Sequence, residues 1–212
     1  MVAKIFAILF LISLGINIFF LVKKPMVVTQ DYAVIGVIDG DTLLIDGKNK
    51  VRLRHINAPE LNFCGGPEAK VELEKLIKGK RVRLVNEIPD PWGRDMALVF
   101  VGNEMVNKTL IEKGIVKYYH DSTPYAAELK TAGDKAKENN LGIFGKCQSK
   151  IPPDPKCIIK GNFDPQKNEY KYFLPNCAQY NYTIVQQDIG EKWFCTEKEA
   201  QDAGFKKAET CH

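Results

Sequence analysis

The sequence has few of the residues that build zinc and redox centres. It contains three histidines in 212 residues, and none of its six cysteines belongs to a CxxC pair. Zinc sites and thiol redox motifs usually depend on such closely spaced ligands. The cysteines are Cys64, Cys147, Cys157, Cys177, Cys195 and Cys211. An even, dispersed set predicts three disulfides in an oxidising compartment, and the alternative is a set of buried free thiols.

The chain also lacks a strong excess of one charge. Thirty Lys and Arg residues stand against 26 Asp and Glu residues, and three of the lysines lie before residue 25. Residues 31–146 hold 18 basic and 17 acidic residues, and residues 147–212 hold nine of each. Nucleic-acid-binding domains commonly carry a clear basic surplus. Bulk charge therefore does not predict nucleic-acid binding, and only a local cluster could indicate it.

One long stretch near the start has no charge. Residues 5–22 are eighteen uncharged residues between Lys4 and the pair Lys23 and Lys24. This length is near the lower limit for a membrane-spanning helix and long for the apolar part of a signal peptide. We predict an uncleaved anchor over residues 1–24, with a cleaved signal peptide or a buried helix as alternatives. The cysteines then favour the extracellular side for the rest of the chain.

A β-rich domain is predicted over residues 32–147, after a short stalk at 25–31. Runs rich in β-branched residues, separated by Asp-Gly turn signals, indicate strands at 33–38, 42–45, 50–56, 81–88 and 97–101. Helical patterns that end at glycines occupy 66–79, 105–114 and 125–141. The expected fold is α+β, with a five-stranded OB-type barrel and about three helices, because a closed sheet leaves no bare edges.

Three short clusters in this domain could carry chemistry. They are DGDT at residues 39–42, RLRHINAPE at 52–60 and WGR at 92–94. Each alone has an ordinary structural explanation: a hairpin turn, a strand with Arg52 and Arg54 on its solvated face, and a loop turn. In this order and spacing, the three clusters together resemble the staphylococcal-nuclease-like (thermonuclease) family.

The resemblance covers about residues 31–147 and implies an OB-type barrel that cleaves DNA and RNA phosphodiester bonds with Ca²⁺, leaving 3′-phosphates. Arg52 and Arg94 match the two arginines that clamp the phosphate, a task suited to forked guanidinium donors. Glu60 matches the carboxylate that orients or deprotonates the attacking water. Asp41 matches a carboxylate ligand of the metal, and oxygen ligands suit a hard cation.

Asn57 departs from the family pattern, because it stands where a second metal carboxylate is expected. Its carbonyl oxygen can still bind Ca²⁺, but one negative charge is lost, which predicts weaker binding rather than an inactive site. Ala58 would offer only its backbone carbonyl. Trp92, Tyr119 and His120 stand near the family's nucleotide-contacting aromatics, where they would stack on bases or simply pack against the protein.

The composition changes after Cys147. Residues 148–156 contain the run IPPDP, which indicates a linker, and residues 157–212 form a small module that needs covalent cross-links at that size. The module is distantly similar to the zinc-binding module of the Ada DNA-repair protein, but Phe173 and Ala208 replace two of the four zinc cysteines. Zinc is not expected, because its tetrahedral ligand set is incomplete. A Cys64–Cys147 disulfide would tie the loop after Glu60 to the end of the last helix. The likeness to the Ada module implies Cys177–Cys211, which leaves Cys157 to pair with Cys195.

These features together predict a monomeric, membrane-anchored, Ca²⁺-dependent nuclease that acts on DNA and RNA at the extracellular side. The alternative is a nucleic-acid-binding protein that has lost catalysis through Asn57. Retention of Arg52, Glu60 and Arg94 argues against it, because binding alone does not require a water-orienting carboxylate. A structural envelope protein would leave these three residues unexplained. The ligand of the C-terminal module is not predicted.

Overall fold

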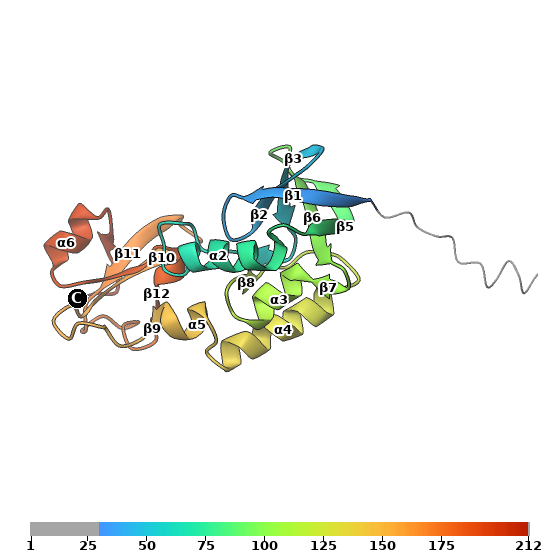
Figure 1. Cartoon of the computed structure of the whole chain (residues 1–212). Coiled ribbons are helices and arrows are strands. Elements are labelled where there is room, and N and C mark those ends of the chain that lie inside the picture. Colours follow the sequence, from blue (N-terminus) through green and yellow to red (C-terminus); the bar gives the residue numbers. More distant parts are fainter. Residues whose placement is uncertain (1–29, 212) are drawn as a thin grey trace, which may run out of the picture. The chain divides into compact units, whose positions relative to one another are not determined.

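The computed structural model describes residues 30–211 of the chain (Figure 1). The predicted membrane anchor at residues 1–24 and most of the predicted stalk lie outside the described residues, so both stay predictions. Within residues 30–211, no helix combines the length and the apolar character that crossing a membrane requires.

Three strands form at the start of the described chain, because Asp-Gly turns interrupt runs of β-branched residues. β1 (Asp31–Val37) pairs antiparallel with β2 (Thr42–Ile45), and β2 pairs antiparallel with β3 (Lys48–Leu53). Gly47, between β2 and β3, has a φ of 75°. Glycine adopts this left-handed conformation without steric cost, which makes the tight reversal possible.

Two further strands close the sheet into a barrel. β5 (Arg81–Pro89) pairs antiparallel with β1 on one side and with β6 (Asp95–Val101) on the other. β6 then pairs in parallel with β3, so that five strands form a ring in the order β3-β2-β1-β5-β6. β7 (Glu104–Met105) adds a short strand beside β6. The mixed α+β architecture and the closed sheet agree with the predicted OB-type barrel.

Three helices form close to their predicted positions. They are α2 (Gly66–Ile77), α3 (Val106–Glu112) and α4 (Ala126–Glu138). α2 buries Ala69, Leu73 and Ile77, which are spaced four residues apart on one helix face. α3 and α4 lie side by side (Figure 1). The sequence pattern does not indicate the short α5 (Ile143–Lys146), which is too brief to show a periodicity.

One apolar core fills the barrel and continues under these helices. Its largest fully buried side chains include Leu43, Ile45, Leu53, Ile56, Leu73, Ile77, Leu98, Leu110, Ile111 and Leu129. Alternate residues of each strand point inward and pack closely. The core therefore determines where each strand ends, and the strand ends position the loops that carry the site.

A second, smaller sheet forms in the C-terminal module. Its strands are β13 (Lys192–Phe194), β10 (Ile159–Asp164), β11 (Glu169–Phe173) and β14 (Lys206–Lys207), in that order. α6 (Glu197–Asp202) packs on β10 and β13. The core of this module is small, with Ile159, Tyr172, Phe194 and Phe205 buried together. So small a core gains stability from covalent cross-links.

All six cysteines form the predicted disulfides, which are Cys64–Cys147, Cys157–Cys195 and Cys177–Cys211. Within the predicted linker, β9 (Gln148–Ser149) pairs with β12 (Val185–Gln186) of the module. A 3₁₀ turn, η1 (Gln187–Ile189), follows β12. Part of the predicted linker is therefore a strand. The predicted division into two domains stays a prediction.

Candidate active site

Eight of the nine non-cysteine residues predicted for the site line one cleft of about 640 Å³. The eight are Asp41, Arg52, Asn57, Ala58, Glu60, Trp92, Arg94 and Tyr119. His120 does not line this cleft, although it lies in the described part of the chain. The lining also includes Asp39, His55 and Asp90, three titratable residues to which the sequence motifs assign no role.

A pair of two-residue strands forms one side of the cleft. β4 (Ile56–Asn57) pairs antiparallel with β8 (Lys117–Tyr118), and Asn57 lies directly opposite Lys117. The next residue, Tyr119, donates its backbone N–H to the carbonyl of His55 at 2.7 Å. This pairing places both Asn57 and Tyr119 at the cleft, although they are far apart in the sequence.

Two glycines bring acidic residues close to α2. A Cβ on Gly40, in the DGDT turn, would lie 2.5 Å from the Ala69 Cβ and 2.6 Å from the Ala58 Cβ. A Cβ on Gly66, at the start of α2, would lie 1.9 Å from the carbonyl oxygen of Glu60. A side chain at either position would force the turn or the Glu60 loop away from the helix. DGDT is thus a turn packed against the site and not only a hairpin connection.

Asp41 is a buried acid of the cleft, with 3% of its surface exposed. Its Oδ1 accepts from Arg52 Nη1 at 2.5 Å, and its Oδ2 accepts from the Ala58 N–H at 3.0 Å. The other guanidinium nitrogen of Arg52, Nη2, donates to Asn57 Oδ1 at 2.9 Å. Burial raises the pKa of the Asp41 carboxyl, and the Arg52 guanidinium opposes that rise. Arg52 therefore links the two residues predicted to bind the cation.

Arg94 is held by a carboxylate from its own turn. Its Nε donates to Asp90 Oδ2 at 2.5 Å, while Asp90 Oδ1 accepts the backbone N–H groups of Trp92 and Arg94, each at 2.8 Å. Burial acts to raise the pKa of Asp90, but the hydrogen bonds from Arg94 and Trp92 outweigh it and the net pKa is lowered. The Arg94 guanidinium also lies 5.4 Å from the centre of the Trp92 ring. Asp90 thus fixes the position of Arg94, one of the two arginines predicted to bind the phosphate.

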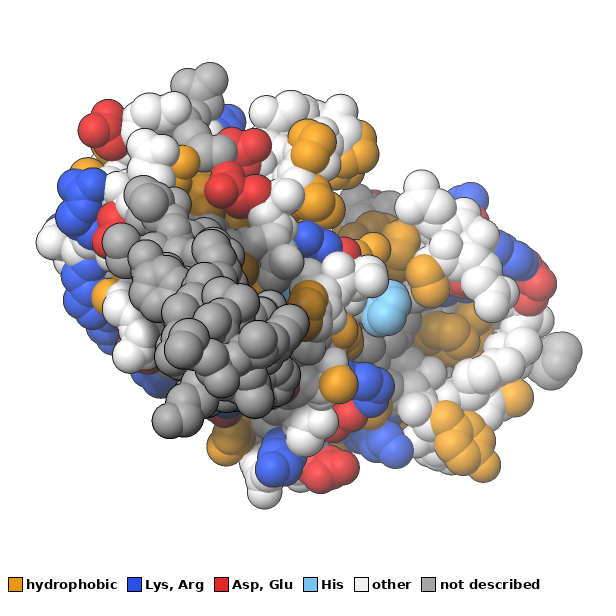
Figure 2. Space-filling model, turned by 90° about the vertical axis from the view of Figure 1, so that its right-hand side faces the viewer, with side chains coloured by type: hydrophobic (Ala, Val, Ile, Leu, Met, Phe, Trp, Pro, Cys, Tyr) orange, Lys and Arg blue, Asp and Glu red, His pale blue; other side chains and the backbone are white. Residues whose placement is uncertain are grey.

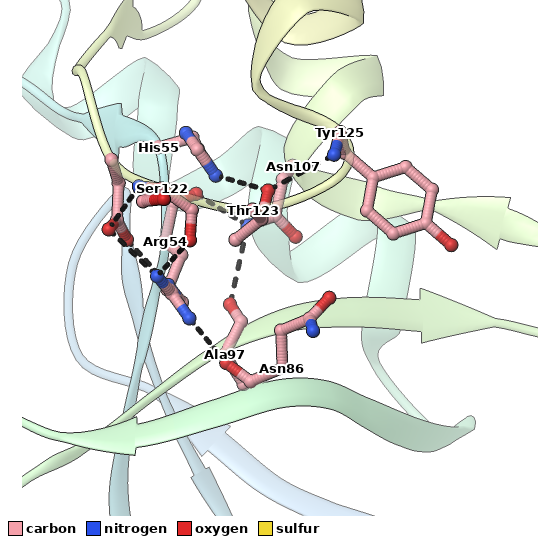
Figure 3. A network of polar contacts seen from close by, with 9 residues as sticks. Arg54, His55, Asn86, Ala97, Asn107, Ser122, Thr123 and Tyr125 are labelled. Carbon is pink, nitrogen blue, oxygen red and sulfur yellow. Dashed lines mark hydrogen bonds and ion pairs between the residues drawn. The ribbon is translucent and has the colours of Figure 1, made fainter.

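A second ionic network is centred on Arg54 (Figure 3). Arg54 is 4% exposed and pairs bidentately with Asp121, at 2.5 Å for Nε to Oδ2 and 2.7 Å for Nη2 to Oδ1. It also donates to the carbonyls of Asn86 and Ser122. Arg54 is therefore not on a solvated strand face, and the alternation of Arg52 and Arg54 does not mark an exposed strand edge.

His55 and Asn107 extend this network (Figure 3). His55 Nε2 lies 2.7 Å from Thr123 Oγ1, and burial lowers the pKa of His55. Asn107 donates to the Arg54 carbonyl and accepts the Val99 N–H, both at 2.8 Å. These bonds tie α3 and the loop after Tyr119 to the end of β3, immediately before the residues of the cleft.

Surface charge does not single out a second nucleic-acid interface on the face shown in Figure 2. On the described part of that face, Lys and Arg side chains are interspersed with Asp and Glu side chains. This agrees with the near balance of charge along the chain.

The part of the chain that carries this cleft is similar to known proteins. The family model described as staphylococcal nuclease homologue matches residues 50–146. The thermonuclease of Staphylococcus intermedius is 34% identical over 128 residues, which are 54% of this chain and 76% of the relative. This chain belongs to the staphylococcal nuclease family. Its membership makes it a nuclease, an enzyme that hydrolyses nucleic acids.

Other relatives of this staphylococcal nuclease homologue carry similar names. An uncharacterized endonuclease of Haemophilus influenzae is 34% identical over 119 residues, covering 52% of this chain and 64% of the relative. Endonuclease YncB of Bacillus subtilis is 29% identical over 139 residues, covering 58% and 64%. These matches support the nuclease domain. The likeness of the C-terminal module to the Ada module stays a prediction.

The cleft of this family member fits a hard cation. Four carboxylates line it, from Asp39, Asp41, Glu60 and Asp90, against the guanidinium groups of Arg52 and Arg94. Such a surplus of negative charge would repel a phosphodiester unless a cation offset it. Residues 30–211 contain no cluster of three or more His, Cys, Asp or Glu residues arranged for a metal. Few protein ligands completed by water, all through oxygen, suit Ca²⁺ or Mg²⁺ better than zinc.

Sequence reasoning missed two supporting acids of the nuclease site. Asp90 has a local signal, because an acid four residues before an arginine in a Pro- and Gly-containing loop can cap that loop and bind the arginine. Asp121 has none, because its partner Arg54 is 67 residues away. The roles assigned by resemblance to the cleft residues stay predictions.

Proposed function

We propose that this nuclease hydrolyses DNA and RNA phosphodiester bonds with Ca²⁺ and leaves 3′-phosphates, acting at the outer surface of the cell. The observation that supports the reaction best is the convergence of Arg52, Arg94 and Glu60 on one cleft that also contains Asp41. The three residues proposed to be catalytic come from β3, the loop before α2 and the turn before β6, so their convergence depends on the fold.

The two arginines would hold the scissile phosphate. Hydrolysis adds a water oxygen to phosphorus and builds negative charge on the non-bridging oxygens, which guanidinium donors stabilise. Arg94 uses Nε for Asp90, so its Nη groups can donate to a phosphate. Arg52 donates to Asp41 and Asn57 in the absence of substrate. We expect Arg52 to exchange one of these bonds for a phosphate oxygen when substrate binds.

Glu60 would activate the water. Its side chain is exposed at the cleft, and its carbonyl is packed against Gly66 at the start of α2. An exposed carboxylate on a well-anchored backbone can accept the proton of an attacking water. The bond from phosphorus to the 5′-oxygen breaks, and the departing oxygen takes up a proton from solvent. Trp92 and Tyr119, both exposed at the cleft, would stack on the flanking bases.

Asp41 and Asn57 would hold the cation, with the backbone of Ala58 nearby. Ca²⁺ when bound would supply positive charge to the phosphate oxygens and to the attacking water. Because Asn57 brings no charge and its Oδ1 accepts from Arg52, we expect weaker Ca²⁺ binding than with two carboxylates.

Digestion of plasmid DNA and RNA by residues 25–212 tests this function. We expect cleavage with millimolar Ca²⁺, none with chelator, and 3′-phosphate ends on the products. Intact DNA binding without any cleavage would instead support the alternative of a nucleic-acid-binding protein that has lost catalysis.

The cell-surface location rests on the three disulfides and on the apolar stretch at residues 5–22. Protease added to intact cells should digest the nuclease domain while a cytoplasmic marker survives. Nuclease that is digested only after the cells are lysed would contradict this location, and nuclease found in the medium would indicate a cleaved signal peptide.

A further inference from the structure

The segment 185–190 of the C-terminal module contacts the loop that carries Glu60 and also the cysteine to which that loop is cross-linked. Gln187 donates its N–H to the Cys147 carbonyl at 2.8 Å and accepts the Cys64 N–H at 3.4 Å. Cys64 and Cys147 are themselves joined by a disulfide. A Cβ on Gly190 would lie 2.7 Å from Cζ of Phe63, and the N–H of Phe63 donates to the Glu60 carbonyl at 2.9 Å. The module therefore packs directly on the residues that follow Glu60.

The same segment holds a lysine of the nuclease barrel. Lys117 Nζ lies 2.5 Å from Asp188 Oδ2 and donates to Gln186 Oε1 at 2.9 Å. Asp188 is 2% exposed, and its Oδ1 accepts from Gln148 Nε2 at 3.1 Å. Only Asp188 is enclosed, because the Lys117 side chain is 25% exposed, and removing Lys117 would leave the enclosed carboxylate without compensation. The contacts with Asp188 and Gln186 thus hold the Lys117 ammonium group against the module.

Lys117 is also the cross-strand partner of Asn57. Side chains of directly paired residues leave an antiparallel ladder on the same face, with their Cβ atoms about 5 Å apart. The side chain of Lys117 therefore leaves its strand beside Asn57, which is predicted to bind the cation. A free ammonium there would repel a divalent cation, and Asp188 pairs with this charge and draws it toward the module, where the buried Glu191 carboxyl also interacts with it.

We propose that Asp188 is a positioning residue of the nuclease site. It holds Lys117 and pairs with its charge, so that Ca²⁺ can bind next to Asn57, and this makes the C-terminal module part of the cation site. The inference rests on the proposed function for the identity of the cation. It goes further by giving the module a role in the reaction.

A double-mutant cycle in the full chain tests the charge argument. The proteins are wild type, Asp188→Asn, Lys117→Met and the double variant, and Ca²⁺ alone is titrated into each by calorimetry. We expect Asp188→Asn to weaken Ca²⁺ binding about 10-fold, because it frees the Lys117 charge beside the cation. Lys117→Met should bind at least as tightly as wild type, and the double variant should recover most of the loss. As a control, Glu209→Gln, which breaks the exposed Lys167–Glu209 pair of the same module, should change nothing.

Two results would overturn the proposal. One is Ca²⁺ binding by Asp188→Asn that equals wild type. The other is a double variant as weak as Asp188→Asn, since a purely structural contact is not rescued by removing its second partner. If Asp188→Asn does not fold, Asp188→Ala enters the cycle in its place, because it also removes the carboxylate that pairs with Lys117.

Amide hydrogen exchange without Ca²⁺ separates this inference from the proposed function. Asp188→Asn should speed exchange at residues 56–65 about 10-fold while the strands β1 and β5 keep wild-type rates, because only the local contact is lost. Unchanged exchange at residues 56–65 would reject the positioning role. If the wild-type chain binds no Ca²⁺, the calcium dependence in the proposed function is wrong. The amide-exchange rates at residues 56–65 would then still decide whether Asp188 positions the Glu60 loop.

Discussion

At the scale of single residues, the side chain proposed to activate water and those proposed to bind phosphate are held in different ways. Glu60 is exposed and makes its structural contacts through its backbone, whereas Arg52 and Arg94 are already engaged by carboxylates. Catalysis and substrate binding can therefore be disturbed independently.

Glu60→Gln should lower the rate of DNA cleavage about 10²- to 10⁴-fold, the range usual for loss of a general base. DNA binding should persist, because the phosphate-binding arginines are untouched. Cleavage kinetics and a binding isotherm with Ca²⁺ measure the two effects. Glu138→Gln, at the exposed end of α4, is the matched control. Cleavage at the wild-type rate would remove Glu60 from the mechanism.

Asn57→Asp should restore a charge to the cation site. We expect the Ca²⁺ concentration for half-maximal cleavage to fall about 3- to 10-fold, because affinity at oxygen sites follows the number of charged ligands. Part of the gain will be lost to Arg52, which already donates to this position. Asn103→Asp, which adds the same charge in the turn between β6 and β7, should have no effect. A loss of activity would show that Asn57 is not a cation ligand.

At the scale of elements, the pair Arg54–Asp121 joins the end of β3 to the loop before α4. Hydrogen bonding to Arg54 lowers the pKa of Asp121, so its carboxylate stabilises the folded chain when ionised. This stabilisation is fully present above the unfolded pKa of about 3.9 and is lost as the pH falls through the lower folded pKa.

Asp121→Asn should lower the free energy of unfolding by about 3 kcal/mol at pH 7, because Arg54 would stay buried without its counter-charge. The difference from wild type should shrink as the pH falls below about 4. Urea unfolding at a series of pH values measures both effects. Asp134→Asn, at an exposed pair with Lys130, should leave stability unchanged. A difference that does not depend on pH would contradict the ionic role of Asp121.

At the scale of the whole molecule, the Cys64–Cys147 disulfide links the loop after Glu60 to the residue that also binds the module. It closes a loop of 83 residues, and closing a loop of that size stabilises by about 4–5 kcal/mol in the chain-entropy model. The double variant Cys64→Ala/Cys147→Ala should lose stability of this order and should show faster amide exchange around Glu60. A variant that keeps its stability and its exchange pattern would show that packing alone holds the loop.

The amino-acid sequence by itself determined the main strands and helices of the nuclease domain and most of the cleft. The sequence predicted the strands at 42–45 and 81–88 and the helix that ends before Gly79. These elements depend on runs of β-branched residues and on glycines at their ends, which are signals that act over a few residues. The three clusters could be assembled because their order and spacing are characteristic of one family. The Cys157–Cys195 and Cys177–Cys211 pairs also followed from resemblance.

Only the tertiary structure decided which charges support that cleft. Arg54 is buried against Asp121 and not solvated, and Lys117 pairs with Asp188 beside Asn57. Partners such as Arg54 and Asp121 lie 67 residues apart, and no local pattern encodes a contact of that range. The physical reason is that an ion pair depends on distance and burial in space, which the barrel and the module establish only once the whole chain has folded.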